Sequence, residues 1–139
     1  MDVRLQAFSE SVTGFDYLVH VDLQALAKQF DERLIDGLQN GMVQKLEYTT
    51  EIGWKTLKEF LKAQAGVDEA SPKKVVKACY REEYLDEADY LLFLHAIDDR
   101  NRLSHVYSKK DFLEILARLP GYAAMFKRIA QRLANDWSE

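Results

Sequence analysis

The 139-residue sequence has little of what marks several large protein classes, with one cysteine, two prolines and six glycines. Because Cys79 has no second thiol to pair with, an internal disulfide and a cysteine-rich zinc site are excluded. No stretch reaches the ~18 to 20 apolar residues needed to cross a bilayer, so no membrane association is expected. The N-terminal MDVRLQAFSE also lacks the apolar core of a signal peptide. We therefore expect a cytoplasmic protein.

An excess of basic residues is also missing. The 19 Lys and Arg are outnumbered by 23 Asp and Glu, which gives a net charge of −4 at pH 7. A general nucleic-acid coat protein needs a basic excess to neutralise phosphates, so that class is excluded. If the protein binds RNA, a few clustered Arg and Lys side chains must do so against an acidic background.

What remains is typical of a folded helical domain. Hydrophobic residues make up 47% of the chain and charged residues 30%, which is ordinary for a globular protein. The length suits one domain, residues 1–139, with a single core. Apolar residues recur at helical spacing, and no alternation is long enough for a strand. The sequence thus predicts an all-α fold, an up-and-down antiparallel helical bundle.

The spacing of apolar residues, together with glycine and asparagine turn signals, locates the helices of the first half. Apolar residues at helical spacing predict a helix over 2–19 and a second amphipathic stretch over 23–38. We expect Asn40-Gly41 to form a turn or a kink after it. The strongest helix is predicted over 42–63, and Gly66 is expected to end it.

The second half carries clearer start and stop signals. They are an N-cap and a first-turn proline at Ser71-Pro72, a helix from near Asp86 to about Val106, a capping-box pattern over Ser108–Asp111, and a break at Pro120-Gly121. A last helix is expected over 122–134. Short connections between these helices favour the bundle.

Polar residues replace apolar ones at the end of the 86–106 helix. At ~100° per residue, Arg100, Ser104 and Tyr107 continue an apolar stripe, while Asn101 and His105 continue its neighbour. Histidine titrates near neutrality and can move a proton. Arginine offers a fork of donors to a phosphate whose charge grows in the transition state. Since RNA carries its own 2′-hydroxyl nucleophile, these groups point to phosphodiester cleavage without metal.

The spacing of this pair leaves alternatives open. Arg100 and His105 lie ~140° apart on an ideal helix, so either the helix frays before His105 or a second copy completes the site across a two-fold axis. In the structural interpretation, Arg100 pairs with an acid such as Glu83 or Asp86, and His105 caps carbonyls at the helix end. Spacing alone favours that structural interpretation.

Three segments resemble one family. The stretch RNRLSHVY, residues 100–107, resembles the R-x4-H-x-Y signature of HepT-like HEPN proteins, long described as nucleotidyltransferase substrate-binding proteins. The segments GMVQKLEYTTE at 41–51, with WKTLK after it, and SPKKVV at 71–76 are similar to the family's long second helix and to the start of its next one. The likeness runs in order from about Gly41 to Lys110. The first forty residues match only as amphipathic helix, with an insertion before Asn40.

The resemblance implies a bundle that forms a homodimer, with the Arg and His of both protomers lining a shared cleft. In the family's toxin–antitoxin members this cleft degrades RNA, and a cognate minimal nucleotidyltransferase silences it by adding AMP to the motif tyrosine. Carried over to this chain, Arg100 holds the phosphate, His105 is the general acid or base, and Asn101 orients one of them. Tyr107 is the target of AMP addition. No cofactor or metal is implied.

Two main hypotheses follow. The first is a metal-independent endoribonuclease toxin subunit, neutralised through Tyr107 by its cognate nucleotidyltransferase. The second is a non-catalytic substrate-binding or regulatory subunit of a two-component nucleotidyltransferase, and a plain dimeric helical module is the weaker third. Glu47 and Glu51 are interpreted as solvated or ion-paired, because no histidines at matching spacing complete a di-metal bundle site. Trp54 is interpreted as core or dimer interface.

Overall fold

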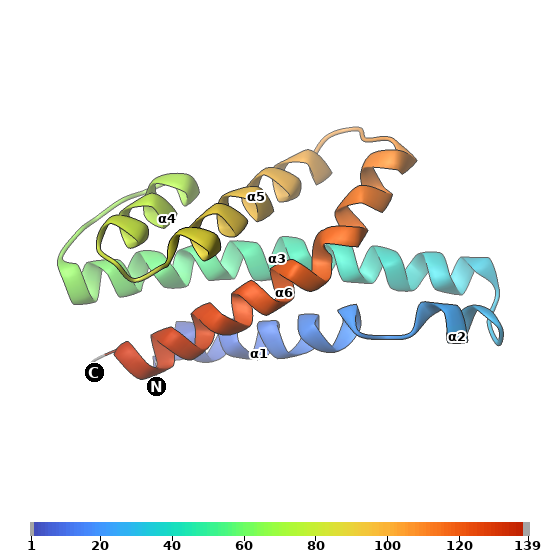
Figure 1. Ribbon diagram of the computed structural model, residues 1–139, viewed down its shortest axis with the longest axis horizontal. Helices are drawn as coiled ribbons and strands as arrows, with labels where there is room; N and C mark the ends of the chain where they lie inside the picture. The colour runs from blue at the N-terminus through green and yellow to red at the C-terminus, as the bar shows by residue number, and fades with distance from the viewer. Residues whose placement is uncertain (1, 138–139) are drawn as a thin grey trace.

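The computed structural model describes residues 2–137, and this part of the chain forms helices without strands. The elements are α1 (Val3–Val19), α2 (Leu23–Ala27), α3 (Glu32–Ala65), α4 (Pro72–Arg81), α5 (Glu87–Leu103) and α6 (Lys109–Asp136). Figure 1 shows α1, α3, α5 and α6 running alternately in opposite directions, so the predicted all-α, up-and-down bundle is confirmed.

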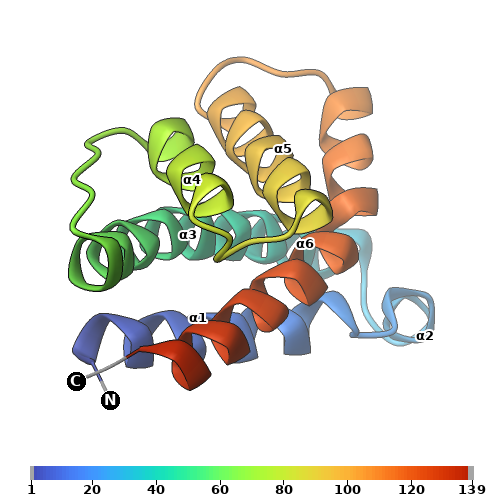
Figure 2. The same cartoon turned by 60° about the vertical axis from the view of Figure 1, so that its left-hand side comes forward.

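The core lies where α1, α3 and α6 pack together, with α4 and α5 against the other side of α3 (Figure 2). The Phe126 ring lies 6.1 Å from that of Phe8 and 5.4 Å from that of Phe93, both nearly perpendicular to it. Gly53 on α3 faces this cluster, because a β-carbon there would lie 3.0 Å from the Phe8 ring and 3.3 Å from that of Phe93. A larger residue at position 53 would therefore push the aromatic cluster apart.

Capping residues that the sequence predicts lie at most helix ends. Asp86 is the N-cap of α5, and its side chain accepts a hydrogen bond from the Asp89 amide. Gly66 ends α3 in the left-handed conformation, with φ of 68°, which costs glycine nothing. Ser71 and Pro72 open α4, and the reciprocal capping box of Ser108 and Asp111 opens α6. These predictions are confirmed.

The predicted turn or kink at Asn40-Gly41 is wrong, since α3 continues through both residues. Its N-cap lies earlier, at Asp31, whose carboxylate accepts from the Leu34 amide at 3.1 Å. The Asn40 side chain donates to the Asp36 carbonyl one turn back at 2.8 Å, which a helix accommodates. A single glycine costs a helix about 1 kcal/mol, and the buried face that follows outweighs this cost.

The predicted break at Pro120-Gly121 is also wrong. Pro120 lies inside α6, which Figure 1 shows bent about midway along its length. Proline removes one backbone hydrogen bond and crowds the preceding turn, so it bends a helix whose two halves are both held by packing. Leu119 and Tyr122 on either side are each only 1% exposed, and this burial keeps the helix continuous.

Helix α5 ends at Leu103, earlier than the predicted Val106. Ser104 is the C-cap, and the His105 amide still donates to the Arg102 carbonyl at 3.2 Å. Residues 104–108 therefore form a connection to α6, and the stripes drawn through Ser104, His105 and Tyr107 on an ideal helix do not apply.

Candidate active site

Arg100 lies in the last turn of α5 and pairs with α3. Its Nη2 atom is 3.0 Å from Oε2 of Glu51, and the two side chains are 37% and 33% exposed. The acid is thus neither Glu83 nor Asp86, the two candidates considered from the sequence. A guanidinium carries five N–H donors; here the Nε atom is buried without a hydrogen-bond partner among the described residues, while the side chains of the pair as a whole are partly exposed. Arg100 can therefore still bind an approaching phosphate.

Glu51 gathers three donors around one carboxylate. Besides Arg100, it accepts from Trp54 Nε1 at 3.1 Å and lies 3.1 Å from Lys55 Nζ. Partial burial raises the pKa of Glu51, but the hydrogen bonds from Trp54 and Lys55 and the charge of Arg100 outweigh it and hold the pKa below its ordinary value. Glu51 is therefore ionised at neutral pH and holds two cations on one surface. Its interpretation as ion-paired is confirmed.

Asn101, in the last turn of α5, and His105, two residues after its end, both have exposed side chains. The Asn101 carbonyl accepts from the Ser104 amide at 3.2 Å and from its hydroxyl at 2.6 Å, which closes the helix end. Within residues 2–137, no hydrogen bond or ion pair joins Arg100, Asn101 and His105 to one another. Of the two alternatives, the helix thus ends before His105, and a single copy does not link the imidazole to the guanidinium.

Tyr107 lies at the surface within the α5–α6 connection, close to the first half of α3. It is 38% exposed, and its ring is stacked on that of Phe112 with centroids 6.2 Å apart and planes 16° from parallel. It lines a shallow pocket of about 230 Å³ together with Asp36, Asn40 and Lys109. A partner enzyme can therefore approach this tyrosine from solvent.

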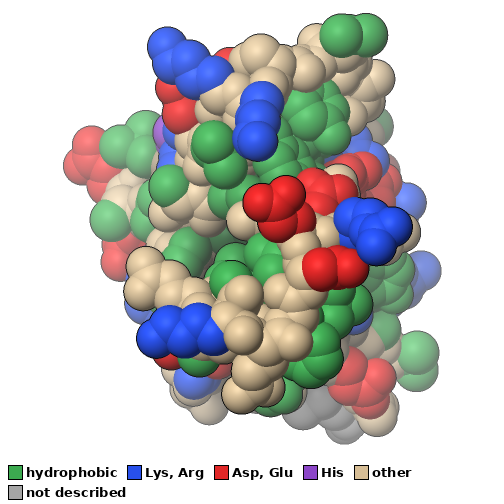
Figure 3. Space-filling view, turned by 90° about the vertical axis from the view of Figure 1, so that its right-hand side faces the viewer, with side chains coloured by type: hydrophobic (Ala, Val, Ile, Leu, Met, Phe, Trp, Pro, Cys, Tyr) green, Lys and Arg blue, Asp and Glu red, His purple; other side chains and the backbone are tan. Residues whose placement is uncertain are grey.

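An open groove adjoins this pocket at the end of the molecule formed by α2 and the starts of α3 and α6. Figure 3 shows hydrophobic side chains around a hollow on this end, with acidic and basic groups between and beside them. The groove measures about 670 Å³ and shares Asp36, Lys109 and Phe112 with the Tyr107 pocket. Tyr107 thus lies at the edge of an open, partly apolar surface.

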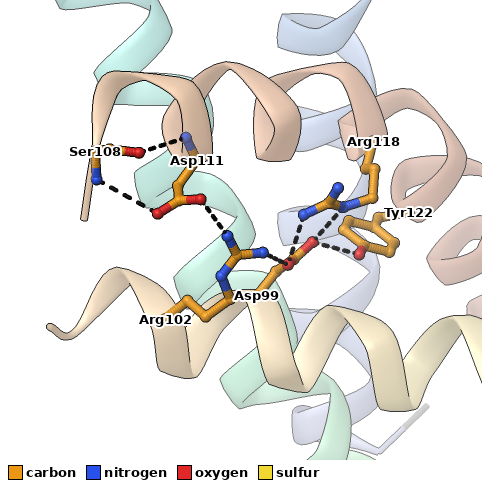
Figure 4. A network of polar contacts seen from close by, with 6 residues as sticks. All are labelled: Asp99, Arg102, Ser108, Asp111, Arg118 and Tyr122. Carbon is orange, nitrogen blue, oxygen red and sulfur yellow. Dashed lines mark hydrogen bonds and ion pairs between the residues drawn. The ribbon is translucent and has the colours of Figure 1, made fainter. Parts of the chain in front are cut away.

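Asp99, one residue before Arg100, is the buried centre of a polar network (Figure 4). Its side chain is 1% exposed and accepts from Arg118 Nε at 2.7 Å, from Arg118 Nη2 at 2.8 Å and from the Tyr122 hydroxyl at 2.5 Å. Burial raises the pKa of Asp99, but these hydrogen bonds and the Arg118 charge outweigh it and hold the pKa below its usual value. Burial and the Asp99 carboxylate raise the pKa of Tyr122, which stays a neutral donor.

Arg102 links the buried Asp99 carboxylate to the start of α6, just after the residues that join α5 and α6. Its Nη1 lies 3.4 Å from Oδ1 of Asp99, and its Nη2 lies 2.8 Å from Oδ1 of Asp111. The other oxygen of Asp111 accepts from the Ser108 amide at 3.4 Å, and the Ser108 hydroxyl accepts from the Asp111 amide at 3.1 Å. The sequence reasoning missed Asp99, Arg102 and Arg118. The one local signal was the unusual Asp in the capping box.

Two further properties concern the described part of the chain. No cluster of three or more His, Cys, Asp or Glu side chains among residues 2–137 is placed to hold a metal ion. None of the helices in the same range combines the length and the apolar character that a membrane span requires.

Solved structures define the class of fold. A protein from Thermus thermophilus is 25% identical, with a TM-score of 0.77, and the match covers 91% of this chain and 98% of that one. A tri-AMPylated HEPN toxin from Shewanella oneidensis, solved in complex with an MNT antitoxin, is 12% identical with a TM-score of 0.78. That match covers 98% of this chain and 100% of the toxin, and at this identity it shows the fold alone. The architecture is that of HEPN helical proteins.

The sequence itself identifies the family. Residues 5–135 match the family described as "Nucleotidyltransferase substrate binding protein like", and the chain belongs to it. This confirms the resemblance noted over residues 41–110 and extends it to the N-terminal helices. No curated protein matches the chain.

Proposed function

We propose that this chain is a metal-independent endoribonuclease toxin subunit that acts as a homodimer. A cognate minimal nucleotidyltransferase neutralises it by adding AMP to Tyr107. One observation carries the catalytic part: the Arg100 side chain, which is 37% exposed, and the exposed imidazole of His105 both lie at the C-terminal end of α5. The family description and the AMPylated toxin of Shewanella oneidensis support the partner.

The reaction assigned to this site needs no group that the chain lacks. One His105 removes the proton of the 2′-hydroxyl, whose oxygen attacks the adjacent phosphorus. The bond to the 5′-oxygen breaks, and that oxygen takes a proton from a water molecule, while the proton that His105 accepted passes to solvent. Arg100 stabilises the charge that grows on the phosphate oxygens, and Asn101 orients one of these groups. The products are a 2′,3′-cyclic phosphate and a 5′-hydroxyl.

Cleavage of a short RNA in the presence of a chelator tests this proposal. The purified chain is expected to cut the RNA and to leave a cyclic phosphate, because the nucleophile belongs to the substrate. The same RNA with 2′-O-methyl groups throughout is expected to stay intact, since its nucleophile is blocked. Mass spectrometry of the fragments identifies the ends. Cutting of the methylated RNA, or no cutting of the natural one, contradicts the assigned chemistry.

Incubation with the cognate nucleotidyltransferase and ATP is expected to raise the mass of the chain by whole AMP units. The gain should vanish in Tyr107→Phe, because the acceptor oxygen is gone, and RNA cleavage should then survive exposure to the partner. Tyr48→Phe is the matched control, since Tyr48 is also a solvent-exposed tyrosine, at 56%. Labelling that persists in Tyr107→Phe places the modification elsewhere.

A non-catalytic substrate-binding subunit is the second candidate. It is favoured by the pairing of Arg100 with Glu51 and by the missing contact between Arg100 and His105 within residues 2–137. In that case the chain should bind RNA or nucleotide without cutting it, and its addition should raise kcat/KM of the nucleotidyltransferase. The chelator assay on the isolated chain separates the two candidates.

A further inference from the structure

We propose that Arg102 and Asp111 form a latch that fixes the connection 104–108, and with it His105 and Tyr107, relative to the body of the bundle. The catalytic consequence of this latch rests on the proposed function, whereas its structural effect does not. Both residues are positioning residues, because in the described part of the chain no hydrogen bond or ion pair joins either side chain to the side chains assigned to the reaction.

The latch has a rigid base. Asp99 is held on two sides by Arg118 and once more by the Tyr122 hydroxyl, all from α6. A carboxylate that is 1% exposed and so fully hydrogen-bonded has no room to change its rotamer. Arg102 Nη1 lies 3.4 Å from this fixed carboxylate, so the buried Asp99 side chain holds one end of the Arg102 guanidinium in place.

The other side of the same guanidinium reaches the first turn of α6, directly after the connection. Nη2 of Arg102 lies 2.8 Å from Asp111, whose second carboxylate oxygen accepts from the Ser108 amide (Figure 4). A planar fork can bridge two carboxylates in this way, while a lysine ammonium acts as a point charge on a flexible stem. One side chain therefore ties the end of α5 to the start of α6.

Little else holds the connection. Val106 at its centre is fully exposed, and the His105 side chain is exposed as well. Ser104 bonds to the Asn101 carbonyl through its amide and its hydroxyl, the His105 amide makes one turn-type bond to Arg102, and the Tyr107 ring stacks on Phe112. Since apolar burial contributes so little here, the conformation of 104–108 depends on its two tied ends.

The consequence concerns geometry more than global stability. Arg102 is 41% exposed and Asp111 36%, and exposed ion pairs contribute little to the free energy of unfolding. A catalytic group displaced by about 1 Å, however, costs on the order of 10²-fold in rate. Loss of the latch should therefore lower kcat while leaving phosphate binding by Arg100, and hence KM, nearly unchanged.

The test compares Arg102→Gln, Arg102→Lys and Asp111→Asn with the parent chain, by hydrogen exchange of the amides at 104–108 and by steady-state RNA cleavage. We expect exchange at least about tenfold faster in all three, and kcat lower by about 10- to 100-fold with KM changed less than about twofold. Arg102→Lys should fail to restore either value, because lysine keeps the charge but not the bridge. Arg4→Gln is the matched control, since the Arg4 side chain is exposed and lies 4.0 Å from Glu59 in an exposed ion pair.

Unchanged exchange at 104–108 in both Arg102→Gln and Asp111→Asn overturns the latch. Faster exchange with an unchanged kcat overturns its positioning role. Full rescue by Arg102→Lys reduces the interaction to charge alone and also overturns the bridge. If the parent chain cuts no RNA, the proposed function fails, and the exchange measurement still decides whether the latch exists. Asp111→Asn also weakens the capping box of α6, whereas Arg102→Gln does not. An effect seen in both variants therefore comes from the ion pair and not from the lost cap.

Discussion

Replacing Arg100 or His105 with alanine is expected to lower the rate of RNA cleavage by about 10²- to 10⁴-fold, the range of a lost general acid–base or a lost electrostatic donor. Arg100→Ala removes the group that meets the growing charge on the phosphate, whereas His105→Ala removes the proton carrier. Steady-state kinetics on a short RNA measure both. The site assignment would be falsified by a His105→Ala protein that cuts RNA as fast as the parent.

Both variants should keep the fold. His105 is an exposed side chain outside the helices, and Glu51 retains Trp54 and Lys55 as partners when Arg100 is removed. Circular dichroism and thermal unfolding close to those of the parent are the control. Lys58→Ala serves as the matched control for loss of a cation near α3, because Lys58 pairs with Asp68 at the surface.

Mixing the two inactive variants tests whether the site spans two copies. If each site takes Arg100 from one protomer and His105 from the other, a mixed dimer contains one intact site. Random exchange of protomers should then restore about a quarter of the parental activity. Activity that stays at the level of the separate variants places both residues of a site in one protomer.

The sequence predicted the fold through signals that act locally. The caps at Asp86 and Ser108 and the left-handed Gly66 work within a few residues, so they can be read without the tertiary structure. Asn40-Gly41 misled because the buried face of α3 that follows it opposes its local preference, and Pro120-Gly121 misled because buried residues on both sides hold α6 together. The burial that outweighs them comes from helices far away in the sequence.

The candidate site was predictable only in part, for the same reason. Arg100, His105 and Tyr107 stand out through their motif, but the partner of Arg100 lies on another helix, at Glu51. Asp98 and Asp99 are adjacent acids that no local pattern separates. In the structure the Asp98 side chain is 52% exposed and pairs with Lys73, while that of Asp99 is 1% exposed and centres the polar network. Long-range packing alone decides which of the two is structural.

The largest expected effect on stability comes from Asp99→Asn. The substitution keeps the shape of the side chain but removes its negative charge. That charge compensates Arg118, and the carboxylate that carries it accepts a hydrogen bond from the Tyr122 hydroxyl. Breaking a buried ion pair from one side costs about 3 to 5 kcal/mol, and the 28% exposure of Arg118 places this case near about 3 kcal/mol, because water can solvate the freed guanidinium. Urea unfolding at neutral pH measures the loss. Asp98→Asn is the matched control and should stay within about 1 kcal/mol of the parent, since its ion pair is exposed.

The same carboxylate gives the parent chain a specific dependence on pH. The pKa of Asp99 in the folded protein lies below its ordinary 3.8, so the stabilisation is fully present above that value. It is lost as the pH falls through the lowered, folded-state pKa, because protonation then costs the network its charge. Asp99→Asn lacks this contribution at every pH. The gap in unfolding free energy between the two proteins should therefore be constant near neutrality and shrink below about pH 4. A gap that stays constant into acid would show that Asp99 is not the ionised centre of the network.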